Sequence, residues 1–312
     1  MYPLLRNTLL IFALTGSMSA CSVSSHPTQA ATLGKPVTST QMEALIDQPG
    51  PIELQTFASA DWEIDLSGLL NLSHPKAKAA GLKDKMEAIQ VYAHVLKHPR
   101  FGTYLVDTGV SEQLINKPEE TGIGWAVRQA MHLEKMKAVH PTAEIVAQLH
   151  APLQGVFFTH LHFDHISGMP DIPAATALFS GPHETTDRHW MNIFTHGTTD
   201  ALLTGKAPVQ EWQFQPDADR RFAGVTDIFG DGSIFAIWSP GHTAGSVAYV
   251  VRTTQGPVLL TGDVCHTRWG WEHDVEPGSF TRDQTSNAAS LHALKLLADR
   301  HPGMQVRLGH QP

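Results

Sequence analysis

The sequence predicts a mixed fold of the α/β (α+β) class, in which strands and helices are interspersed along one chain. Several apolar runs have the length of a strand and end at a turn or a polar residue, as at residues 155–158, 233–238 and 258–262. Two further stretches, 123–139 and 142–149, place apolar residues at helical spacing. A chain of 312 residues with 42% hydrophobic and 17% charged side chains has the composition of a soluble globular protein with ample material for a core.

The first 20 residues are typical of an export signal and are left out of fold prediction. Arg6 is the only charged residue among them, residues 9–14 form an apolar run, and the mostly small residues at 17–20 suit a cleavage site. The apolar run is far shorter than the ~20 residues that a helix needs to cross a bilayer. We therefore expect residues 1–20 to be a signal peptide.

Residues 18–21, Met-Ser-Ala-Cys, resemble the lipobox of bacterial lipoproteins, although methionine is a weaker first residue than leucine. The resemblance implies a mature chain that begins at a lipidated Cys21 and is anchored in a membrane. Ser22, rather than aspartate, resembles the pattern that is sent on to the outer membrane, on the periplasmic side. The alternative is an ordinary secretory signal that is cleaved nearby, with Cys21 incidental. Both interpretations predict export.

Residues 21–40 are rich in serine, threonine and proline and show no apolar periodicity. This composition predicts a flexible tether, followed by a folded domain over residues 41–312. Cys265 is the second of the two cysteines, so lipidation of Cys21 would leave no intramolecular disulfide.

The charge of the chain argues against a nucleic-acid partner. The formal net charge is −8, and the lysines and arginines form no basic stripe. Binding to a phosphate backbone depends on clustered positive charge.

Residues 90–96 and 103–107 are predicted to be two strands joined by a turn. Asp107 closes the second of them in the sequence Asp-Thr-Gly. Its carboxylate could orient a metal-binding histidine, or it could simply be a turn residue, and the sequence leaves both roles open. Farther along, Thr142 is suited to cap the second predicted helix.

Residues 159–165, Thr-His-Leu-His-Phe-Asp-His, hold three imidazoles and a carboxylate within six positions, directly after an apolar run. Alternate side chains of an extended segment share a face, so His160 and His162 point the same way. The adjacent Asp164 and His165 must diverge and could serve a second metal. This spacing predicts a metal site rather than a histidine-rich surface loop.

Three more candidate ligands stand where predicted strands end. His242 lies in a Pro-Gly-His-Thr turn between two apolar segments, Asp263 closes the run at 258–263, and His310 follows residues 306–309. Each could instead be an ordinary turn or terminal residue with no metal. Taken with the first cluster, they favour one shared centre.

These four motifs resemble the metallo-β-lactamase superfamily, whose marks are a His-x-His-x-Asp-His run, a Gly-His turn, an aspartate after a strand and a late Gly-His. The match covers residues 90–310 in order and spacing. The resemblance implies that residues 41–312 form a catalytic domain folded as an αββα four-layer sandwich, two mixed β-sheets with flanking helices.

The resemblance also implies two divalent metal ions and their ligands. Zinc is the default, and manganese, iron or cobalt are compatible with the same donors. One ion would be held by His160, His162 and His242, the other by Asp164, His165 and His310, with Asp263 bridging both.

The implied reaction is hydrolysis of an ester-type bond by a hydroxide that bridges the metals, with Asp263 as bridging ligand and Asp164 orienting the hydroxide. Within the superfamily, Asp263 argues against true β-lactamases, which hold serine or cysteine there. His162 argues against flavodiiron oxidoreductases, and His165 and His310 argue against persulfide dioxygenases. A chain that stops soon after His310 weakens the glyoxalase II-like thioesterase reading. Lactonases of the quorum-quenching type and organophosphate hydrolases remain.

His266 marks the point where the resemblance departs from the lactonases. They commonly carry tyrosine three positions after the bridging aspartate, whereas histidine occurs there in exported organophosphate hydrolases. His266 could be a catalytic proton donor to the leaving group or a partner of a ligand carboxylate. We expect a small lactone as substrate, with phosphoesters or aryl esters as the alternative and a non-catalytic metal-binding lipoprotein as a distant one. The sequence makes no prediction of oligomeric state.

Residues 183–225 show little periodicity but contain four aromatic side chains, Trp190, Phe194, Trp212 and Phe214. We interpret this region as a variable lid and substrate wall. Packing of each aromatic residue against the sandwich is the alternative.

Overall fold

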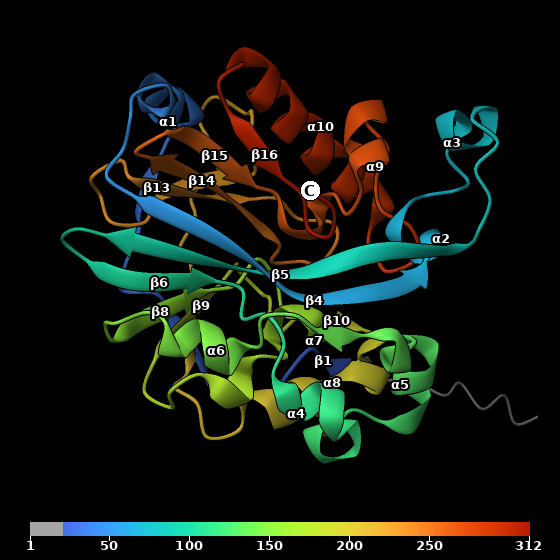
Figure 1. The fold of residues 1–312 in the computed structure, drawn as a ribbon. Helices are drawn as coiled ribbons and strands as arrows, with labels where there is room; N and C mark the ends of the chain where they lie inside the picture. Colours follow the sequence, from blue (N-terminus) through green and yellow to red (C-terminus); the bar gives the residue numbers. More distant parts are fainter. Residues whose placement is uncertain (1–20) are drawn as a thin grey trace, which may run out of the picture.

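The computed structural model describes residues 21–312, and the predicted signal peptide at 1–20 lies outside them. The architecture is the predicted four-layer sandwich: two large mixed sheets face each other, and helices cover both outer faces (Figure 1). Among residues 21–312, no helix has both the length and the apolar character needed to cross a bilayer.

The first sheet has eight strands in the spatial order β2-β11-β9-β8-β6-β5-β4-β7. They are β2 (Thr28–Ala30), β11 (Val209–Glu211), β9 (Ala177–Ser180), β8 (Leu153–Phe157), β6 (Gly102–Val106), β5 (Met86–His98), β4 (Glu53–Asp65) and β7 (Lys137–Ala138). The pairs from β2 to β6 are parallel, and those from β6 to β7 are antiparallel. The predicted strands at 90–96 and 103–107 correspond to β5 and β6.

The second sheet has six strands in the order β16-β15-β14-β13-β12-β3. They are β16 (Gln305–Arg307), β15 (Gly256–Leu260), β14 (Val247–Thr253), β13 (Ile234–Trp238), β12 (Gly224–Asp227) and β3 (Lys35–Val37). All neighbours are antiparallel except β15 and β16. A separate pair, β1 (Cys21–Ser22) with β10 (Arg188–His189), is antiparallel.

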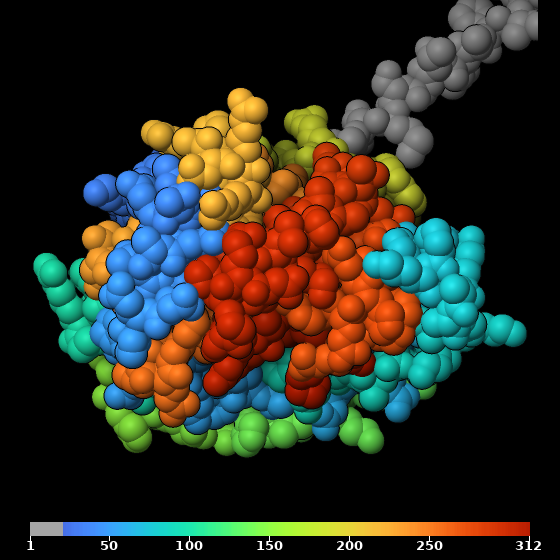
Figure 2. Space-filling view, turned by 90° about the horizontal axis from the view of Figure 1, so that it is seen from above, coloured from blue at the N-terminus to red at the C-terminus, as the bar shows by residue number. Residues whose placement is uncertain are grey.

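Helices complete the two outer layers. Against the eight-stranded sheet lie α4 (Glu112–Asn116), α5 (Trp125–Ala130), α6 (Thr142–Ala147), α7 (Phe163–Ile166) and α8 (Asn192–Leu203). The six-stranded sheet is covered by α1 (Ser39–Ile46) and α10 (Gln284–Arg300), seen from above in Figure 2, with α9 (Arg268–His273) beside them. The short helices α2 (Leu66–Leu69) and α3 (Pro75–Ala79) follow β4, and single 3-10 turns lie at η1 (Pro118–Thr121), η2 (Leu133–Lys135), η3 (Met169–Asp171) and η4 (Gly262–Val264).

Three apolar clusters hold these layers together. One lies between the eight-stranded sheet and its helices, and a second lies between the six-stranded sheet and α1 and α10. The third, which includes Phe157, Tyr249 and Leu260, fills the space between the two sheets. Burial of apolar area is the dominant favourable term in folding, so the two sheets are held face to face by this middle cluster.

The segment at 21–40, expected to be a flexible tether, is instead part of the folded domain. Strand β2 adds to the edge of the first sheet beside β11, and β3 adds to the edge of the second beside β12. Thr38 then caps α1 through a capping box with Gln41. Edge pairing uses backbone hydrogen bonds and leaves side chains exposed, so it requires no apolar pattern and the composition failed to indicate it.

The helix predicted at 123–139 is also wrong over its second half. Helix α5 ends at Ala130, and His132 takes a left-handed backbone conformation with φ of 49° before η2 and β7. Such a residue cannot continue a right-handed helix. The second predicted helix is present as α6, but its N-cap is Pro141, and Thr142 instead donates its hydroxyl to the carbonyl of Thr108 at 2.6 Å.

Candidate metal centre

The first half of the site follows the end of β8. His160 and His162 lie in the loop, and the short helix α7 carries Asp164 and His165. Asp107, at the end of β6, holds the start of this loop: its carboxylate accepts hydrogen bonds from the backbone N–H and the hydroxyl of Thr159, both at 2.8 Å. β6 and β8 are parallel neighbours, which places Asp107 beside Thr159.

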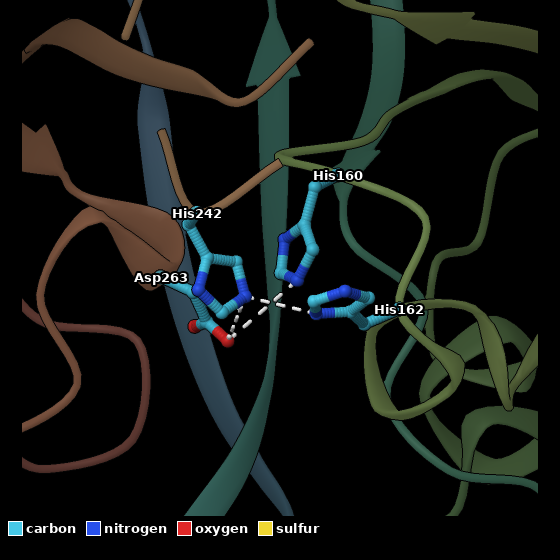
Figure 3. A group of neighbouring side chains, drawn as sticks. All are labelled: His160, His162, His242 and Asp263. Atoms are coloured by element: carbon cyan, nitrogen blue, oxygen red, sulfur yellow. Dashed lines mark hydrogen bonds and ion pairs between the residues drawn. The ribbon is translucent and has the colours of Figure 1, made fainter. Parts of the chain in front are cut away.

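The second half comes from the six-stranded sheet. His242 lies in the turn between β13 and β14, Asp263 lies in η4 after β15, and His310 follows β16. These strand ends meet the β8 loop at one edge of the sandwich, so residues 150 positions apart in the chain share one site. Figure 3 shows His242 and Asp263 facing His160 and His162 across the gap.

The seven predicted ligands form two groups that share Asp263. One group is His160, His162, His242 and Asp263, and the other is Asp164, His165, Asp263 and His310. In each group, one donor atom per residue lies within 4.8 Å of all the others. Of the seven residues, all but His162 are buried.

The Oδ2 atom of Asp263 stands at the centre of a ring of imidazoles. Five ring nitrogens surround it, from His266 at 3.1 Å, His165 at 3.2 Å, His310 at 3.3 Å, His242 at 3.5 Å and His160 at 3.6 Å. A carboxylate in this position can be shared between two cations, as expected of a bridging ligand.

Outer hydrogen bonds decide which nitrogen each ring turns toward the site. Nδ1 of His165 lies 2.8 Å from Oδ2 of Asp107, and Nδ1 of His310 lies 2.8 Å from the carbonyl oxygen of Gln90. Because both partners are acceptors, each Nδ1 carries the hydrogen and each Nε2 directs a lone pair inward. The role that the sequence left open for Asp107, orienting a histidine, is the one the geometry shows.

These inward lone pairs fit a cation. Within the described part of the chain, Nε2 of His160 and Nε2 of His165 are buried and have no hydrogen-bond partner. Nε2 of His310 faces the carboxylates of Asp164 and Asp263, both at 3.3 Å. Lone pairs turned toward one another and toward carboxylates repel unless a positive ion lies among them, so this donor set suits metal ions.

Burial keeps the first group neutral. It lowers the pKa of His162 to about 4, against the carboxylates of Asp164 and Asp263. Burial, followed by the neighbouring His165, holds the pKa of His160 well below its ordinary value, and burial with His162 does the same for His242. Neutral imidazole is the form that binds metal.

The second group is pulled the other way by its carboxylates. Burial would lower the pKa of His165, but Asp263 and Asp107 raise it well above the ordinary value. Burial would raise the pKa of Asp263, but His165 and His310 hold it well below its usual range, so this carboxylate is ionised. Without a cation, the ionised Asp263 therefore favours a proton on Nε2 of His165, and a bound metal ion would take the place of that proton.

Two motif glycines are required by close packing. A Cβ on Gly309 would lie 2.2 Å from Oδ1 of Asp263, and one on Gly241 would lie 2.2 Å from the backbone nitrogen of Asn287. Gly241 also has a backbone φ of 143°, which residues with a side chain rarely adopt. The glycines that precede His242 and His310 thus let the ligand loops approach the shared aspartate.

Glu184 is a residue of the site that sequence reasoning missed. It is buried, and its carboxylate accepts hydrogen bonds from the backbone of Leu161 at 2.8 Å, the hydroxyl of Thr243 at 2.7 Å and the backbone of Gly245 at 2.9 Å. It therefore links the loop of His160 and His162 to the turn of His242. No motif surrounds Glu184 in the sequence, so nothing local could have indicated this role.

His266 lies inside the site. Its Nδ1 is 3.0 Å from the carbonyl oxygen of Leu69, which can only accept, so Nδ1 carries the hydrogen. Nε2 faces Asp263 at 3.1 Å and the ring lines the cavity described below. Both roles predicted for His266, contact with a ligand carboxylate and access to substrate, are therefore compatible with its position.

A cavity of about 480 Å³ opens onto the two groups. His162, Asp164, His242, Asp263 and His310 lie at its floor, and the remaining lining is largely apolar. The apolar wall includes Trp62, Ile64, Leu69, Ile89, Val127, Met131, Phe163 and Phe280.

The four aromatic residues of the predicted lid region divide between the two interpretations. Phe194 lines the cavity, as a substrate wall would. Trp212 is buried in the core between the sheets, where it stacks on Phe179, and Phe214 stacks on Trp238. Trp190 is exposed. Packing therefore explains half of this set, since an aromatic side chain in a loop is as readily a core residue as a ligand contact.

Comparison with known families gives one match that spans most of the chain. The model of the metallo-beta-lactamase superfamily matches residues 87–310, which include all seven predicted ligands.

Known relatives and solved structures agree with that match. The N-acyl homoserine lactonase AttM of Azorhizobium caulinodans is 33% identical over 171 residues, which cover 52% of this chain and 59% of that relative. The AttM lactonase of Rhizobium johnstonii is 28% identical over 237 residues, 72% of this chain and 82% of the relative. The structure of AidC, a dizinc quorum-quenching lactonase, superposes with a TM-score of 0.53 at 15% identity, covering 89% of this chain and 90% of that one.

Proposed function

Because the chain belongs to the metallo-beta-lactamase superfamily, we propose that it is a dinuclear metal-dependent hydrolase that opens the ring of N-acyl homoserine lactones. The observation that carries the proposal is the pair of four-residue groups that share Asp263 beneath a largely apolar cavity. Two relatives of the chain are N-acyl homoserine lactonases.

His160, His162, His242 and Asp263 would hold one metal ion, and Asp164, His165, Asp263 and His310 would hold the other. Imidazole nitrogens combined with carboxylate oxygens favour zinc, and the structurally similar AidC is described as a dizinc enzyme. When bound, two such ions supply hydroxide from a shared water near neutral pH and polarise the carbonyl oxygen of the substrate.

The protein's own side chains account for the remaining steps. Asp164 lines the cavity and can accept a hydrogen bond from the attacking oxygen, which orients it toward the lactone carbonyl. Nε2 of His266 could take up the proton that the attacking water loses and pass it to the ring oxygen as the lactone C–O bond breaks, while its Nδ1–H stays bonded to the carbonyl of Leu69. Both residues are buried, so few bulk water molecules compete with them.

The apolar wall defines the second part of the substrate. An acyl chain laid along Trp62, Met131 and Phe280 would leave water as it enters. Each buried CH₂ group contributes about 0.8 kcal/mol, or roughly fourfold in kcat/KM, until the chain is longer than the wall. We therefore expect a rising preference from short to long acyl chains that levels off.

The test is a purified, metal-quantified protein assayed on acyl-homoserine lactones, aryl esters, phosphotriesters, phosphodiesters and β-lactams. We expect about two metal ions per chain and turnover of lactones that His162→Ala abolishes. The matched control is His292→Ala, an exposed histidine on α10. A protein that holds two metal ions and hydrolyses no ester in the panel would contradict the proposal.

A second candidate substrate class is phosphotriesters, with aryl esters beside it. The observation that favours it is His266 in contact with Asp263, at the position where the lactonases carry tyrosine. The same panel separates the two. If His266→Tyr raises lactone turnover and lowers phosphotriester turnover, the phosphotriester is the better native class.

We also propose export and lipidation, which rest on the sequence of residues 1–21 alone. Cys21 is the first described residue, and it is only partly buried in β1. Labelling of growing cells with a radioactive fatty acid should mark the wild-type chain and not Cys21→Ala, and the label should fractionate with the outer membrane. Label that persists in the variant would contradict lipidation.

A further inference from the structure

Exposed apolar side chains gather on one part of the surface. Among residues 21–312, seven large apolar side chains are exposed, and five of them lie at the start of α5, just before α8 or in the first turn of α8. We call this set the apolar rim: Trp125, Trp190, Met191, Ile193 and Phe194. The most exposed are Trp125 at 72% and Ile193 at 65%. Soluble proteins usually expose such residues singly, so a cluster of this kind marks an interaction surface.

The apolar rim is continuous with the cavity of the metal centre. Met191 and Phe194 of the rim line that cavity, together with Ala126 and Val127, which follow Trp125 on α5. The same cavity reaches His162 and Asp263. Whatever covers the rim therefore lies against the cavity wall.

The N-terminal end of the described chain lies beside the rim. Cys21 pairs with His189, the residue before Trp190, and its carbonyl accepts a hydrogen bond from the Asn192 side chain at 3.0 Å. No tether separates them, because β1, β2 and β3 are built into the domain. The preceding residues carry an apolar run at 9–14 and a single charge, Arg6. Any anchor at or before Cys21 would hold the rim close to a membrane.

We propose that the apolar rim docks on the surface of a lipid bilayer, with the cavity wall turned toward the membrane. Tryptophan is favoured at the boundary between lipid and water, and isoleucine, methionine and phenylalanine gain by leaving water. A single weak anchor gives only reversible binding, and a second contact makes it stable. The docking does not depend on the reaction. Its consequence, entry of a long-chain lactone from the bilayer, rests on the proposed function.

The probe is binding of the full 312-residue chain to neutral phosphatidylcholine vesicles, since a net charge of −8 makes an anionic surface a poor choice. All variants carry Cys21→Ser, so none is lipidated and residues 1–20 contribute equally. The test variant adds Trp125→Ser, Trp190→Ser and Ile193→Ser, three exposed residues outside the cavity lining. The matched control adds Val139→Ser and Leu296→Ser, the two exposed apolar residues elsewhere.

We expect vesicle partitioning of the test variant to fall by about tenfold or more, while the matched control binds like the parent. Backbone amides at residues 190–195 should exchange hydrogen more slowly when vesicles are added to the parent, and those of α10 should not change. A parent chain that fails to bind, or a test variant that binds equally well, would overturn the proposal.

A second copy of the chain is the competing occupant. If the parent dimerises in sedimentation experiments, binds no vesicles, and the test variant is monomeric, the rim is a self-association surface and the lipid proposal is wrong. Hydrolysis of a water-soluble short-chain lactone is measured in parallel. Equal rates in the parent and the test variant show that the fold is intact, and they separate failure of docking from failure of the proposed function.

Discussion

The floor and the apolar rim of one cavity are built in opposite ways. At the floor, buried polar residues arrive from loops after β8, β13, β15 and β16 and are held by outer partners such as Asp107 and Glu184. At the rim, the exposed apolar residues are Trp125 of the six-residue helix α5, which has no side-chain N-cap, and four residues just before α8 or in its first turn. The side chains of the floor are therefore fixed by many contacts, whereas those of the rim make few.

The difference teaches which part of the site can vary without loss of the chemistry. A substitution at the floor disturbs the hydrogen bonds that fix the orientation of the imidazole rings. A change at the rim removes area that faces outward and leaves the ligands where they are. We therefore expect floor substitutions to remove turnover and rim substitutions to alter selectivity or docking.

The largest expected effect is at the residue that both metal groups share. Asp263→Ala should lower bound metal from about two ions to less than one and reduce lactone turnover by about a thousandfold or more, because both groups lose their common ligand. Metal analysis and steady-state kinetics measure the two effects. Asp299→Ala, an exposed aspartate of α10, is the control. Retention of two ions by Asp263→Ala would show that the groups are independent.

A smaller effect is expected at Gly309, which packs against Asp263 but supplies no ligand atom. The Cβ of Gly309→Ala would collide with Oδ1 of Asp263, which must then shift. A displacement of about 1 Å can cost roughly a hundredfold in kcat/KM. Gly303→Ala is the matched control, because nothing lies within 4 Å of its Cβ. Equal activity of the two variants would mean that Asp263 has room to move.

Glu184 tests whether the outer partners hold the floor together. Glu184→Gln keeps the shape but can satisfy fewer of the three donors from Leu161, Thr243 and Gly245. We expect zinc affinity to fall by about 10- to 100-fold, measured by chelator competition. Glu87→Gln, partly exposed on β5, should leave it unchanged. Wild-type affinity in Glu184→Gln would show that the loops are held by other contacts.

His94 is a buried histidine outside the cavity lining, and it should make its own contribution to the pH dependence of stability. Burial, followed by Arg307, lowers the pKa of His94 to about 3, so the folded state stays neutral where the unfolded chain takes up a proton. Stability is therefore present above pH ~6.5 and lost as the pH falls toward 3, by about 2 kcal/mol at pH 5.

His94→Gln removes this loss. Urea unfolding of the metal-free protein at pH 7.5 and pH 5 should show a smaller difference for the variant than for the wild type, by about 2 kcal/mol. The floor histidines are present in both proteins, so most of their contribution to this difference cancels. An unchanged difference would mean that His94 is protonated in the folded state.

The smallest effect is expected at the wall next to the rim. Val127→Trp should narrow the apolar cavity and reduce the preference for long over short acyl chains by about tenfold, with the short-chain rate unchanged. Gln129→Trp on the same helix is exposed and should have no effect. An equal loss of turnover on long-chain and short-chain lactones would mean that Val127 supports the metal ligands and not the acyl chain.

The sequence predicted the floor well because metal ligands leave a local signal. His160, His162, Asp164 and His165 fall within six positions, and His242, Asp263 and His310 each follow a strand. Donor chemistry and spacing are properties of short segments, so a metal site at these residues could be predicted before any contact was known. The sandwich fold was predicted through the family resemblance that the same motifs carry. The two helical predictions were less accurate, because a left-handed His132 ends the first early.

Only the tertiary structure decided how these parts meet. Part of the predicted tether pairs as edge strands β2 and β3. Glu184 joins two ligand loops, and His266 lies against Asp263. The starts of α5 and α8 bring the residues of the apolar rim together beside Cys21. Each depends on a backbone pairing or a side-chain contact between residues far apart in the sequence. The set of metal-type donors was therefore predictable from local pattern, whereas the cavity, the outer partners of the ligands and the apolar rim depend on packing, which no short segment encodes.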